Sequence, residues 1–421
     1  MKIIQTFWTA GQDPLKHSFG WTHPEYNLMS WALSCLSLRE HYDEVELYTD
    51  SAGYHILIEV LQLPYTKTHV IFDNFQCLPH HWALSKIKTY SLQTEPFLHI
   101  DGDIYLPRPL PKRVLNAPLV AQNREFGTSY YRRMMDAFLK HQNISISDFL
   151  RKRWEEQSIS SYNMGVFGGE DLDFIRRYCL EVEDFMWQNH LNDVNDNRSC
   201  ANANVIFEQI LFASFAEKEG RTIQSILEET IDDIGYTTSK FCDIKAWQEK
   251  CLFHIVGGNK RVRDTFIAIE QKLFSSHTGY FRRIASLFPE KHPYMGTTLE
   301  KAFVEQTQKT LTGESFARQS LDDVPHQRYT RNAMLRILPN THEGNTRTAY
   351  LPSIFSCGGK RFTVEPLGMN ILHLLDGRES TMESLCHSLY PCFAPNMREM
   401  AKTWIEKEMH YLLHHGAIII F

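Results

Sequence analysis

One stretch decides the fold: Leu98-His99-Ile100-Asp101-Gly102-Asp103-Ile104-Tyr105-Leu106. An apolar run with β-branched and aromatic members, followed by prolines, is typical of a buried strand. Two carboxylates at the end of such a strand are costly to bury without a partner, and a hard cation such as Mg²⁺ or Mn²⁺ would supply one. The strand ends of open α/β sheets are also where ligands bind. A surface turn with solvated acids is the other interpretation that a bare Asp-x-Asp allows.

Length and composition bound the class of protein. The chain has 421 residues, which favours more than one domain. Its hydrophobic fraction of 43% and charged fraction of 22% are ordinary for a soluble globular protein. A net charge of -6 argues against general affinity for nucleic acid or anionic membranes. The nine cysteines form no Cys-x-x-Cys pair, and neither a signal peptide nor an apolar run of transmembrane length is present, so we expect a cytoplasmic protein without membrane insertion.

Strand-like and helix-like segments alternate outward from the central stretch. The expected strands cover residues 2–8, 45–50, 98–106, 119–123, 160–169 and 251–256. The expected helices cover residues 25–41, 54–61, 81–92, 130–153, 172–188, 205–213, 263–288 and 299–312. This alternation predicts an α/β fold with a mainly parallel sheet covered by helices. The Asn/Asp-rich segment 189–204 is expected to be a loop beside the site, of a length typical of lids.

Polar residues follow several of these strands. Thr9 lies in a small-residue loop where backbone can approach a nucleotide. Asp50 could accept a hydrogen bond from a ribose or base, or cap the next helix. Lys86 could reach a pyrophosphate or remain a solvated lysine. Asn163 offers a donor and an acceptor to a sugar hydroxyl, or satisfies a turn.

A second motif, Cys251-Leu-Phe-His-Ile-Val-Gly-Gly-Asn-Lys260, ends in a turn. By default His254 on an apolar strand is a core histidine. The spacing of Gly257 and Lys260 behind it would let a loop fold back over phosphates.

Taken together, these motifs resemble the GT-A glycosyltransferases, most closely the retaining branch of glycogenin and the bacterial lipopolysaccharide galactosyltransferases. The resemblance covers about residues 1–263 and implies a Rossmann-like mixed sheet with helices on both faces. It implies that Asp101, Asp103 and His254 bind Mn²⁺ or Mg²⁺ and that Gly257 and Lys260 contact the donor diphosphate. Tyr162-Asn163-Met-Gly165-Val166 resembles the segment that faces the donor sugar and the acceptor. The implied donor is a nucleotide-sugar, a UDP-sugar in this branch, with Thr9, Asp50 and Lys86 in its binding site.

The sequence also departs from that family. The family's Asp-Gln-Asp is here Phe207-Glu208-Gln209-Ile210, so the second Asp is missing. Gln209 would then lie by the anomeric carbon, and Gln209 and Asn163 are the candidate catalytic residues. Retention of configuration is implied by the resemblance alone. No nucleophile is apparent, as expected if the leaving phosphate takes the acceptor's proton and the protein mainly positions the partners.

The last 70 residues have a different pattern. Short strands are expected over 353–356, 360–364 and 417–421, and helices over 368–375, 382–389 and 397–415. Three helices and short strands form a winged-helix pattern. The run Gly368-Met-Asn-Ile-Leu-His-Leu-Leu-Asp-Gly-Arg-Glu-Ser-Thr381 resembles PqqD-type domains, which bind leader peptides by adding them as a strand. From residue 334 onward, eight Lys+Arg balance eight Asp+Glu, which weighs against the rival DNA-binding winged helix. A packing or dimerisation module is the other alternative.

We therefore expect three regions: a GT-A domain over 1–263, a helical extension and linker over 264–333, and a PqqD-like winged helix over 334–421. Within the second and third, residues 313–348 are polar with little periodicity and are expected to form the linker. The expected function is transfer of a sugar from a nucleotide-sugar to a peptide or protein acceptor held by the C-terminal domain. The alternatives are a non-catalytic peptide-binding scaffold and a glycosyltransferase acting on a glycan or lipid.

Overall fold

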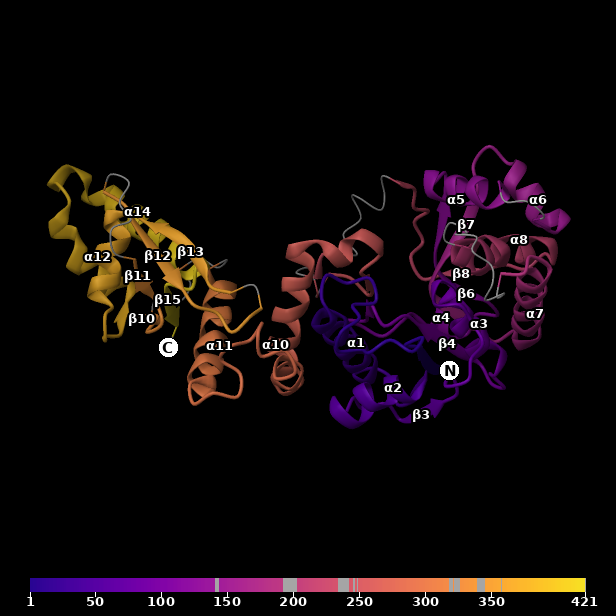
Figure 1. Ribbon diagram of the computed structural model, residues 1–421. Helices are drawn as coiled ribbons and strands as arrows, with labels where there is room; N and C mark the ends of the chain where they lie inside the picture. The colour runs from indigo at the N-terminus through magenta and orange to yellow at the C-terminus, as the bar shows by residue number, and fades with distance from the viewer. Residues whose placement is uncertain are drawn as a thin grey trace. The chain divides into compact units, whose positions relative to one another are not determined.

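The structure is a computed structural model (Figure 1), and it describes residues 1–140, 144–191, 203–233, 242–244, 247, 249–317, 321, 326–338, 345–356 and 358–420. The chain forms two compact units, residues 1–273 and 274–421. Helix α10 (Arg263–Ala285) contributes to both and is interrupted by non-helical backbone at His277. Most of the lid predicted over 189–204 lies outside the described residues. Among the described residues, no helix has the length and apolar character needed to cross a membrane.

The first unit is built on a mixed seven-stranded sheet in the order β3-β2-β1-β4-β7-β6-β8. The strands are β1 (Lys2–Phe7), β2 (Val45–Thr49), β3 (Lys67–Val70), β4 (Phe97–Ile100), β6 (Val120–Phe126), β7 (Ser160–Gly169) and β8 (Gln224–Ser225). β1 is parallel to β2 and β4, whereas β7 runs antiparallel to both β4 and β6. The predicted α/β class is confirmed, and the sheet is mixed.

The helices of this unit match most of the predicted segments. They are α1 (Pro24–Arg39), α2 (Ser51–Tyr54), η1 (His55–Val60), η2 (Pro79–His81), α3 (Ala83–Ser91), α4 (Lys112–Leu115), α5 (Ser129–Leu139), α6 (Asp148–Glu155), α7 (Leu172–Gln188), η3 (Val205–Ile210), α8 (Leu211–Lys218) and η6 (Gly257–Arg261). Two of them, η1 and η3, are π-helical, a form that often occurs at functional sites. The second becomes important below because it carries Glu208.

Neighbouring residues along the central strands face opposite sides of the sheet, and both sides are buried. On one side Ile4, Phe97 and Phe167 join a core with α3, α5, α7 and α8. On the other side Ile3 and Leu98 pack with α1 and α4. Because a sheet covered on both faces buries successive residues, strands such as β4 appear in the sequence as apolar runs.

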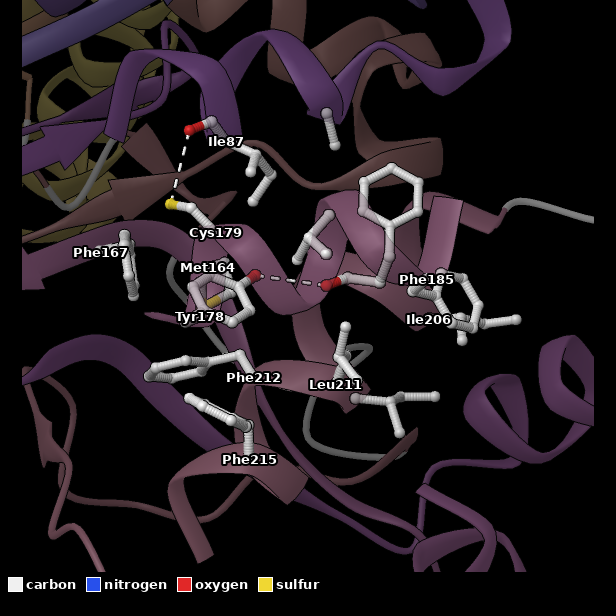
Figure 2. Close-up of a cluster of buried hydrophobic side chains, with 14 of the residues drawn as sticks. Ile87, Met164, Phe167, Tyr178, Cys179, Phe185, Ile206, Leu211, Phe212 and Phe215 are labelled. Atoms are coloured by element: carbon white, nitrogen blue, oxygen red, sulfur yellow. Dashed lines mark hydrogen bonds between the residues drawn. The ribbon is translucent and has the colours of Figure 1, made fainter. Parts of the chain in front are cut away.

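Figure 2 shows part of the first of these cores, where α7 packs on α3 and η3. The Cys179 thiol lies 3.6 Å from the Ile87 carbonyl oxygen, and the Tyr178 hydroxyl donates to the carbonyl oxygens of Phe207 and Glu208, at 3.3 and 2.8 Å. These buried hydrogen bonds fix η3 against α7. The backbone that carries Glu208 is therefore held from behind by a packed core.

The predicted strand over 98–106 is divided in two. β4 ends at Ile100, and after a turn β5 (Ile104–Tyr105) leaves the main sheet to pair with β9 (Phe253–His254). The apolar run did not reveal this division because β5 is fully buried as well. The strand expected over 251–256 is reduced to the two residues of β9, which among the described residues pair with β5 alone.

The described residues of the second unit form two three-stranded sheets, four α-helices and two short 3₁₀ turns. Its elements are α11 (Glu300–Phe316), β10 (Arg328–Arg331), β11 (Arg336–Ile337), β12 (Arg347–Leu351), β13 (Lys360–Val364), α12 (Pro366–Leu374), β14 (Ser380–Thr381), α13 (Met382–Leu389), η8 (Tyr390–Cys392), η9 (Pro395–Met397), α14 (Arg398–His414) and β15 (Ile418–Ile420). The sheet orders are β14-β10-β15 and β11-β12-β13. The three C-terminal helices and the strands at 360–364 and 417–421 are confirmed within one or two residues.

One expectation for the second unit is wrong, and one segment is more ordered than its composition suggests. No strand forms over 353–356: β12 ends before Pro352, and the Phe355 amide donates to the Ser353 hydroxyl in a turn. The segment 313–348 is not simply a linker, since β10 lies within it and pairs with β15 at the end of the chain. Tyr329 on β10 is fully buried. A four-residue strand is too short to show a period, and its partner is about ninety residues away.

Candidate functional site

The candidate site lies where the sheet order changes direction. The chain moves from β1 to β2 and β3 on one side and then returns to place β4 on the other side of β1. Because β1 and β4 are parallel, their carboxyl ends open at the same edge. Ligands of open α/β sheets bind at such switch points. Thr9 follows β1, and Asp101-Gly102-Asp103 follows β4, so both predicted segments reach this edge.

Backbone hydrogen bonds hold the Asp101-Gly102-Asp103 turn, hereafter the Asp turn. The Asp101 amide donates to the Gly165 carbonyl of β7 at 2.9 Å, and the Ile104 amide donates to the Asp101 carbonyl at 3.0 Å. The short pairing of β5 with β9 then places His254 opposite Ile104. One ligand atom from each of Asp101, Asp103 and His254 lies within 4.8 Å of the others. The structure thus brings the three predicted metal ligands together from positions 150 residues apart.

The imidazole of His254 is oriented for ligation. Its Nδ1 lies 2.7 Å from Oε1 of Gln122 on β6, and because a carbonyl oxygen only accepts, Nδ1 carries the proton. Nε2 is then the atom with the lone pair, and it lies 3.5 Å from Asp103 Oδ1. Metal-binding histidines usually donate their other ring N–H to such an oxygen, which fixes the tautomer. Gln122 was missed by the sequence analysis because it begins a run of four polar residues in β6, and no spacing singles it out from the others.

The close approach of His254 depends on a glycine. A Cβ added to Gly165 would lie 2.5 Å from His254 Cε1 and 2.7 Å from Gln122 Oε1. We therefore expect Gly165→Ala to displace the imidazole, at a cost of about 1–3 kcal/mol of stability, and to weaken Mn²⁺ binding at least roughly tenfold through the lost ligand. Titration of purified protein with Mn²⁺ by electron paramagnetic resonance measures this affinity.

The matched control is Gly279→Ala in α10, where an added Cβ meets nothing within 4 Å. Because alanine is the better helix former, that change should raise stability by up to about 1 kcal/mol and leave Mn²⁺ binding unchanged. Equal Mn²⁺ affinity in Gly165→Ala and the native protein would contradict the role assigned to this close packing.

Two lysines balance the carboxylates of the cluster. Lys260 Nζ lies 2.7 Å from Asp103 Oδ2, and Lys86 Nζ lies 2.9 Å from Asp101 Oδ1 and 2.5 Å from Glu208 Oε1. Three carboxylates against two ammonium groups leave a charge of −1 when His254 is neutral. This local excess of negative charge favours a cation.

The protonation of the three carboxylates differs with their partners. Burial opposes ionisation of Asp103, but the charge of Lys260 outweighs it and holds the pKa of that carboxyl well below its usual range. Burial raises the pKa of Asp101 above its usual value in spite of Lys86. Burial likewise raises the pKa of Glu208 to about 7. Asp103 is therefore the carboxylate most firmly ionised for a cation.

Glu208 lies beside the cluster. The sequence analysis singled out its neighbour, Gln209, instead. Glu208 is 2% exposed and shares Lys86 with Asp101, whereas Gln209 accepts a hydrogen bond from the Tyr131 hydroxyl at 2.7 Å. The π-helical turn η3 sets which side chain of this run points toward Lys86. That turn could not be predicted from residue types, although an acidic residue in an apolar helix was itself a signal.

A cavity of about 850 Å³ opens over the Asp turn. Of the predicted site residues, its lining includes Thr9, Lys86, Asp101, Asp103, Gly257 and Lys260. Gly257 adopts φ +49°, a conformation that favours glycine, and an added Cβ there meets nothing within 4 Å. We refer to this space as the β1–β4 cavity.

Aromatic side chains supply much of the cavity wall and were not singled out from the sequence. They are Phe7, Trp8, Phe19, Trp21, Trp31 and Trp82. Lys260 Nζ lies 5.8 Å from the ring centroid of Trp21, within reach of a cation–π interaction. Flat apolar walls with a few convergent polar groups are typical of small-molecule sites.

Thr9 and Asp50 are hydrogen-bonded to each other. Asp50 Oδ2 accepts from the Thr9 amide at 2.8 Å and from the Thr9 hydroxyl at 2.7 Å, and Oδ1 accepts from the Gly53 amide at the start of α2. Asp50 is thus the N-cap of α2, which was one of the two roles that the sequence allowed for it. Its bonds to Thr9 also fix the loop after β1. It shapes the cavity through Thr9.

Asn163 bridges two parts of the sheet behind the Asp turn. Its Oδ1 accepts from the Gly165 amide at 2.9 Å, and its Nδ2 donates to Glu125 Oε1 at 3.4 Å. Asn163 thus satisfies a local turn in the strand that supports the cluster. Glu125 is 3% exposed, and burial raises its pKa from 4.5 to about 8, with a small opposing effect of Asn163.

This carboxyl makes stability depend on pH. Between about pH 5 and 8 the unfolded chain has lost the Glu125 proton while the folded protein keeps it. Stability should therefore fall as pH rises through this window, by about 1.4 kcal/mol per pH unit from this group. Glu125→Gln should remove that contribution, so the variant gains on the native protein with rising pH. Urea unfolding of both proteins between pH 5 and 8 measures the difference, and a constant difference would contradict the buried protonated state.

The first unit is thus a mixed α/β protein with a carboxylate–histidine cluster, able to hold a metal ion, at the switch point of its sheet. The chain belongs to the family of unknown function DUF6734, whose model matches residues 1–287. The match covers the first unit and continues just beyond α10. No curated protein matches the chain.

Proposed function

We propose that the protein is a metal-dependent glycosyltransferase of the GT-A class that takes its sugar from a nucleotide-sugar. The observation that carries the proposal is the convergence of Asp101, Asp103 and His254 beside the carboxyl end of β4, where Asp101, Asp103 and Lys260 line the β1–β4 cavity. A mixed sheet with helices on both faces is the arrangement that the resemblance implies, which supports the assignment.

The residues of the cluster fit a divalent cation. Two carboxylates and one imidazole with a fixed tautomer form a mixed oxygen and nitrogen donor set, which suits Mn²⁺ better than Mg²⁺. A site with three protein ligands leaves positions for a diphosphate. When bound, the cation would offset the charge that grows on the leaving diphosphate.

The side chains around the cluster have separate roles in this proposal. Lys260, 22% exposed at its side chain and paired with Asp103, is placed to donate to phosphate oxygens at the cavity surface. Lys86 is 5% exposed at its side chain and holds Asp101 in place. The aromatic wall would exclude water and bind the flat faces of base and sugar. The protein then acts chiefly by orientation and electrostatics, which needs no protein nucleophile.

The proposed acceptor is a peptide or protein held by the second unit. In the part of this unit that the structure describes, β13 pairs only with β12, so it is an edge strand of the β11-β12-β13 sheet. Lys360, Arg361 and Thr363 on it are exposed. An exposed edge can accept an extended peptide as an additional strand, and the two cations would favour an acidic one.

A thermal-shift screen tests the donor half of the proposal. Purified protein is heated with UDP-, GDP-, CMP- and dTDP-sugars, with and without Mn²⁺. Binding to the folded state stabilises it by about 2.7 kcal/mol at a hundred times Kd, so one nucleotide class should raise the Tm only when Mn²⁺ is present. No shift with any donor from a folded sample would refute the proposal.

The acceptor half needs a peptide. Synthetic peptides from short reading frames beside the gene are incubated with the donor found in the screen and Mn²⁺. Mass spectrometry should detect the addition of one sugar residue. Transfer to a glycan or lipid acceptor, but to no peptide, would keep the glycosyltransferase and reject the peptide acceptor.

A second candidate, a non-catalytic peptide-binding scaffold, is favoured by one observation. Gln209, the expected counterpart of a catalytic residue, is bonded to Tyr131, and Glu208 beside it is committed to Lys86. A nucleotide-sugar that binds with Mn²⁺ but is neither hydrolysed nor transferred would support this candidate.

A further inference from the structure

Helix α1 presents a polar stripe to the Asp turn and to the strand that follows it. Ser30 Oγ donates to the Gly102 carbonyl at 2.9 Å. Ser34 Oγ accepts from Gln5 Nε2 at 3.0 Å and lies 3.4 Å from the Asp101 carbonyl. Ser37 Oγ accepts from the Leu106 amide at 3.1 Å. Residues spaced by three and four share one helix face, so these serines dock α1 along residues 101–106.

Asn27 continues this stripe toward the N-terminus of α1, three residues before Ser30. It is 3% exposed, and its Nδ2 has no hydrogen-bond partner among the described residues. Asn27 lines the β1–β4 cavity together with Trp31, which packs so closely on the Asp turn that a Cβ on Gly102 would lie 2.5 Å from its ring. A buried donor without a partner costs about 1–3 kcal/mol, so in a native protein such a group requires an explanation.

We propose that Asn27 is a ligand-binding residue whose side-chain amide donates to a phosphate oxygen of the nucleoside diphosphate. The unpartnered atom is a donor only, and phosphate oxygens at neutral pH are chiefly acceptors. Lys260 and the candidate metal ligands Asp101 and Asp103 line the same cavity as Asn27. The diphosphate would therefore lie near these residues. This inference rests on the proposed function and adds α1 to the donor site.

The test compares binding of UDP, GDP, CDP and dTDP, each with Mn²⁺, to the native protein and to Asn27→Ala by isothermal titration calorimetry. One of the four diphosphates should bind the native protein best. Because Asn27→Ala loses a hydrogen bond to a charged group, the affinity for that diphosphate should fall roughly ten- to hundredfold. Affinity for Mn²⁺ alone should stay within about twofold, since Asn27 is not one of the three candidate ligands. Asn27→Leu, which keeps the volume, should weaken nucleotide binding equally.

Stability separates a binding role from a structural one. Because the amide donor is unpartnered, its removal should leave the Tm of the ligand-free protein within a few degrees of the native value. The matched control is Ser37→Ala on the same stripe, which loses a bond to Leu106. It should lower the Tm and leave nucleotide affinity unchanged.

The outcomes are distinct. Equal diphosphate affinity in the native protein and both Asn27 variants would overturn the inference and leave the proposed function intact. A loss of affinity for the nucleotide-sugar, with none for the diphosphate itself, would assign the amide to a sugar hydroxyl and overturn the phosphate contact. Failure of the native protein to bind any of the four diphosphates with Mn²⁺ would overturn both proposals.

Discussion

Asp103→Asn is expected to abolish Mn²⁺-dependent donor turnover, with a loss of at least about 10³-fold, because a candidate ligand contributes several kcal/mol of charge stabilisation. The change keeps the shape of the side chain and removes the negative charge that Lys260 stabilises. The Tm increase given by Mn²⁺ with the donor should also vanish. Donor hydrolysis and transfer, followed by chromatography of the released nucleoside diphosphate, measure the first effect, and a thermal shift measures the second.

The control for charge is Asp173→Asn. Asp173 has a side chain 81% exposed and pairs with Arg176 on the surface of α7. Exposed ion pairs contribute little, so this variant should match the native protein in stability within about 0.5 kcal/mol and in turnover. Metal-dependent turnover retained in Asp103→Asn would place the cation elsewhere and remove the main support for the proposed function.

Lys86→Met is expected to cost the most stability, about 3–5 kcal/mol, because it leaves the buried Glu208 and the partly exposed Asp101 without their cation. The side chains of Lys86 and Glu208 are 5% and 2% exposed, so solvent screens the pair very little. The unpaired carboxyls should have raised pKa values in the folded variant. The deficit should therefore shrink as pH falls toward 5, where protonation removes their charge. Urea unfolding between pH 5 and 8 measures both effects.

Two further variants test this explanation. Lys86→Met combined with Glu208→Gln removes one of the two stranded charges and should recover part of the lost stability. Lys88→Met, on an exposed position of the same helix, should change stability by less than about 0.5 kcal/mol. Equal losses in the Lys86 and Lys88 variants would show that the buried ion pairs are not what holds the Asp turn.

Residue types predicted the large elements because burial on both sheet faces leaves a clear apolar pattern. The sequence runs for β2, α7 and α13 match the structure closely. The same pattern could not reveal β5 and β9, which are two residues long and exist only because they pair with each other. His254 was found by its motif, and its partner Gln122 was not, because Gln122 is one of four consecutive polar residues in β6 and no motif distinguishes it.

The site predictions divide in the same way. Asp101, Asp103, His254 and Lys260 follow strand ends and turns, where sequence spacing fixes the position of a side chain. Glu208 and Gln209 lie in a π-helical turn, which rotates the run relative to an ordinary helix. Asp50 could be read as a ribose ligand or an N-cap, and only its three hydrogen bonds identify the cap.

The pairing of β5 with β9 has a consequence for how the protein is made. Asp101 leaves the ribosome about 150 residues before His254, which corresponds to roughly ten to thirty seconds of synthesis at usual rates. During that interval β6, β7 and β8 are added one after another to the strands already made, whereas the imidazole of His254 and Lys260 are still absent. The nascent chain therefore carries the Asp turn before its neighbours His254 and Lys260 have been synthesised. Until residues 253–260 dock, the candidate metal cluster consists of its two carboxylates alone.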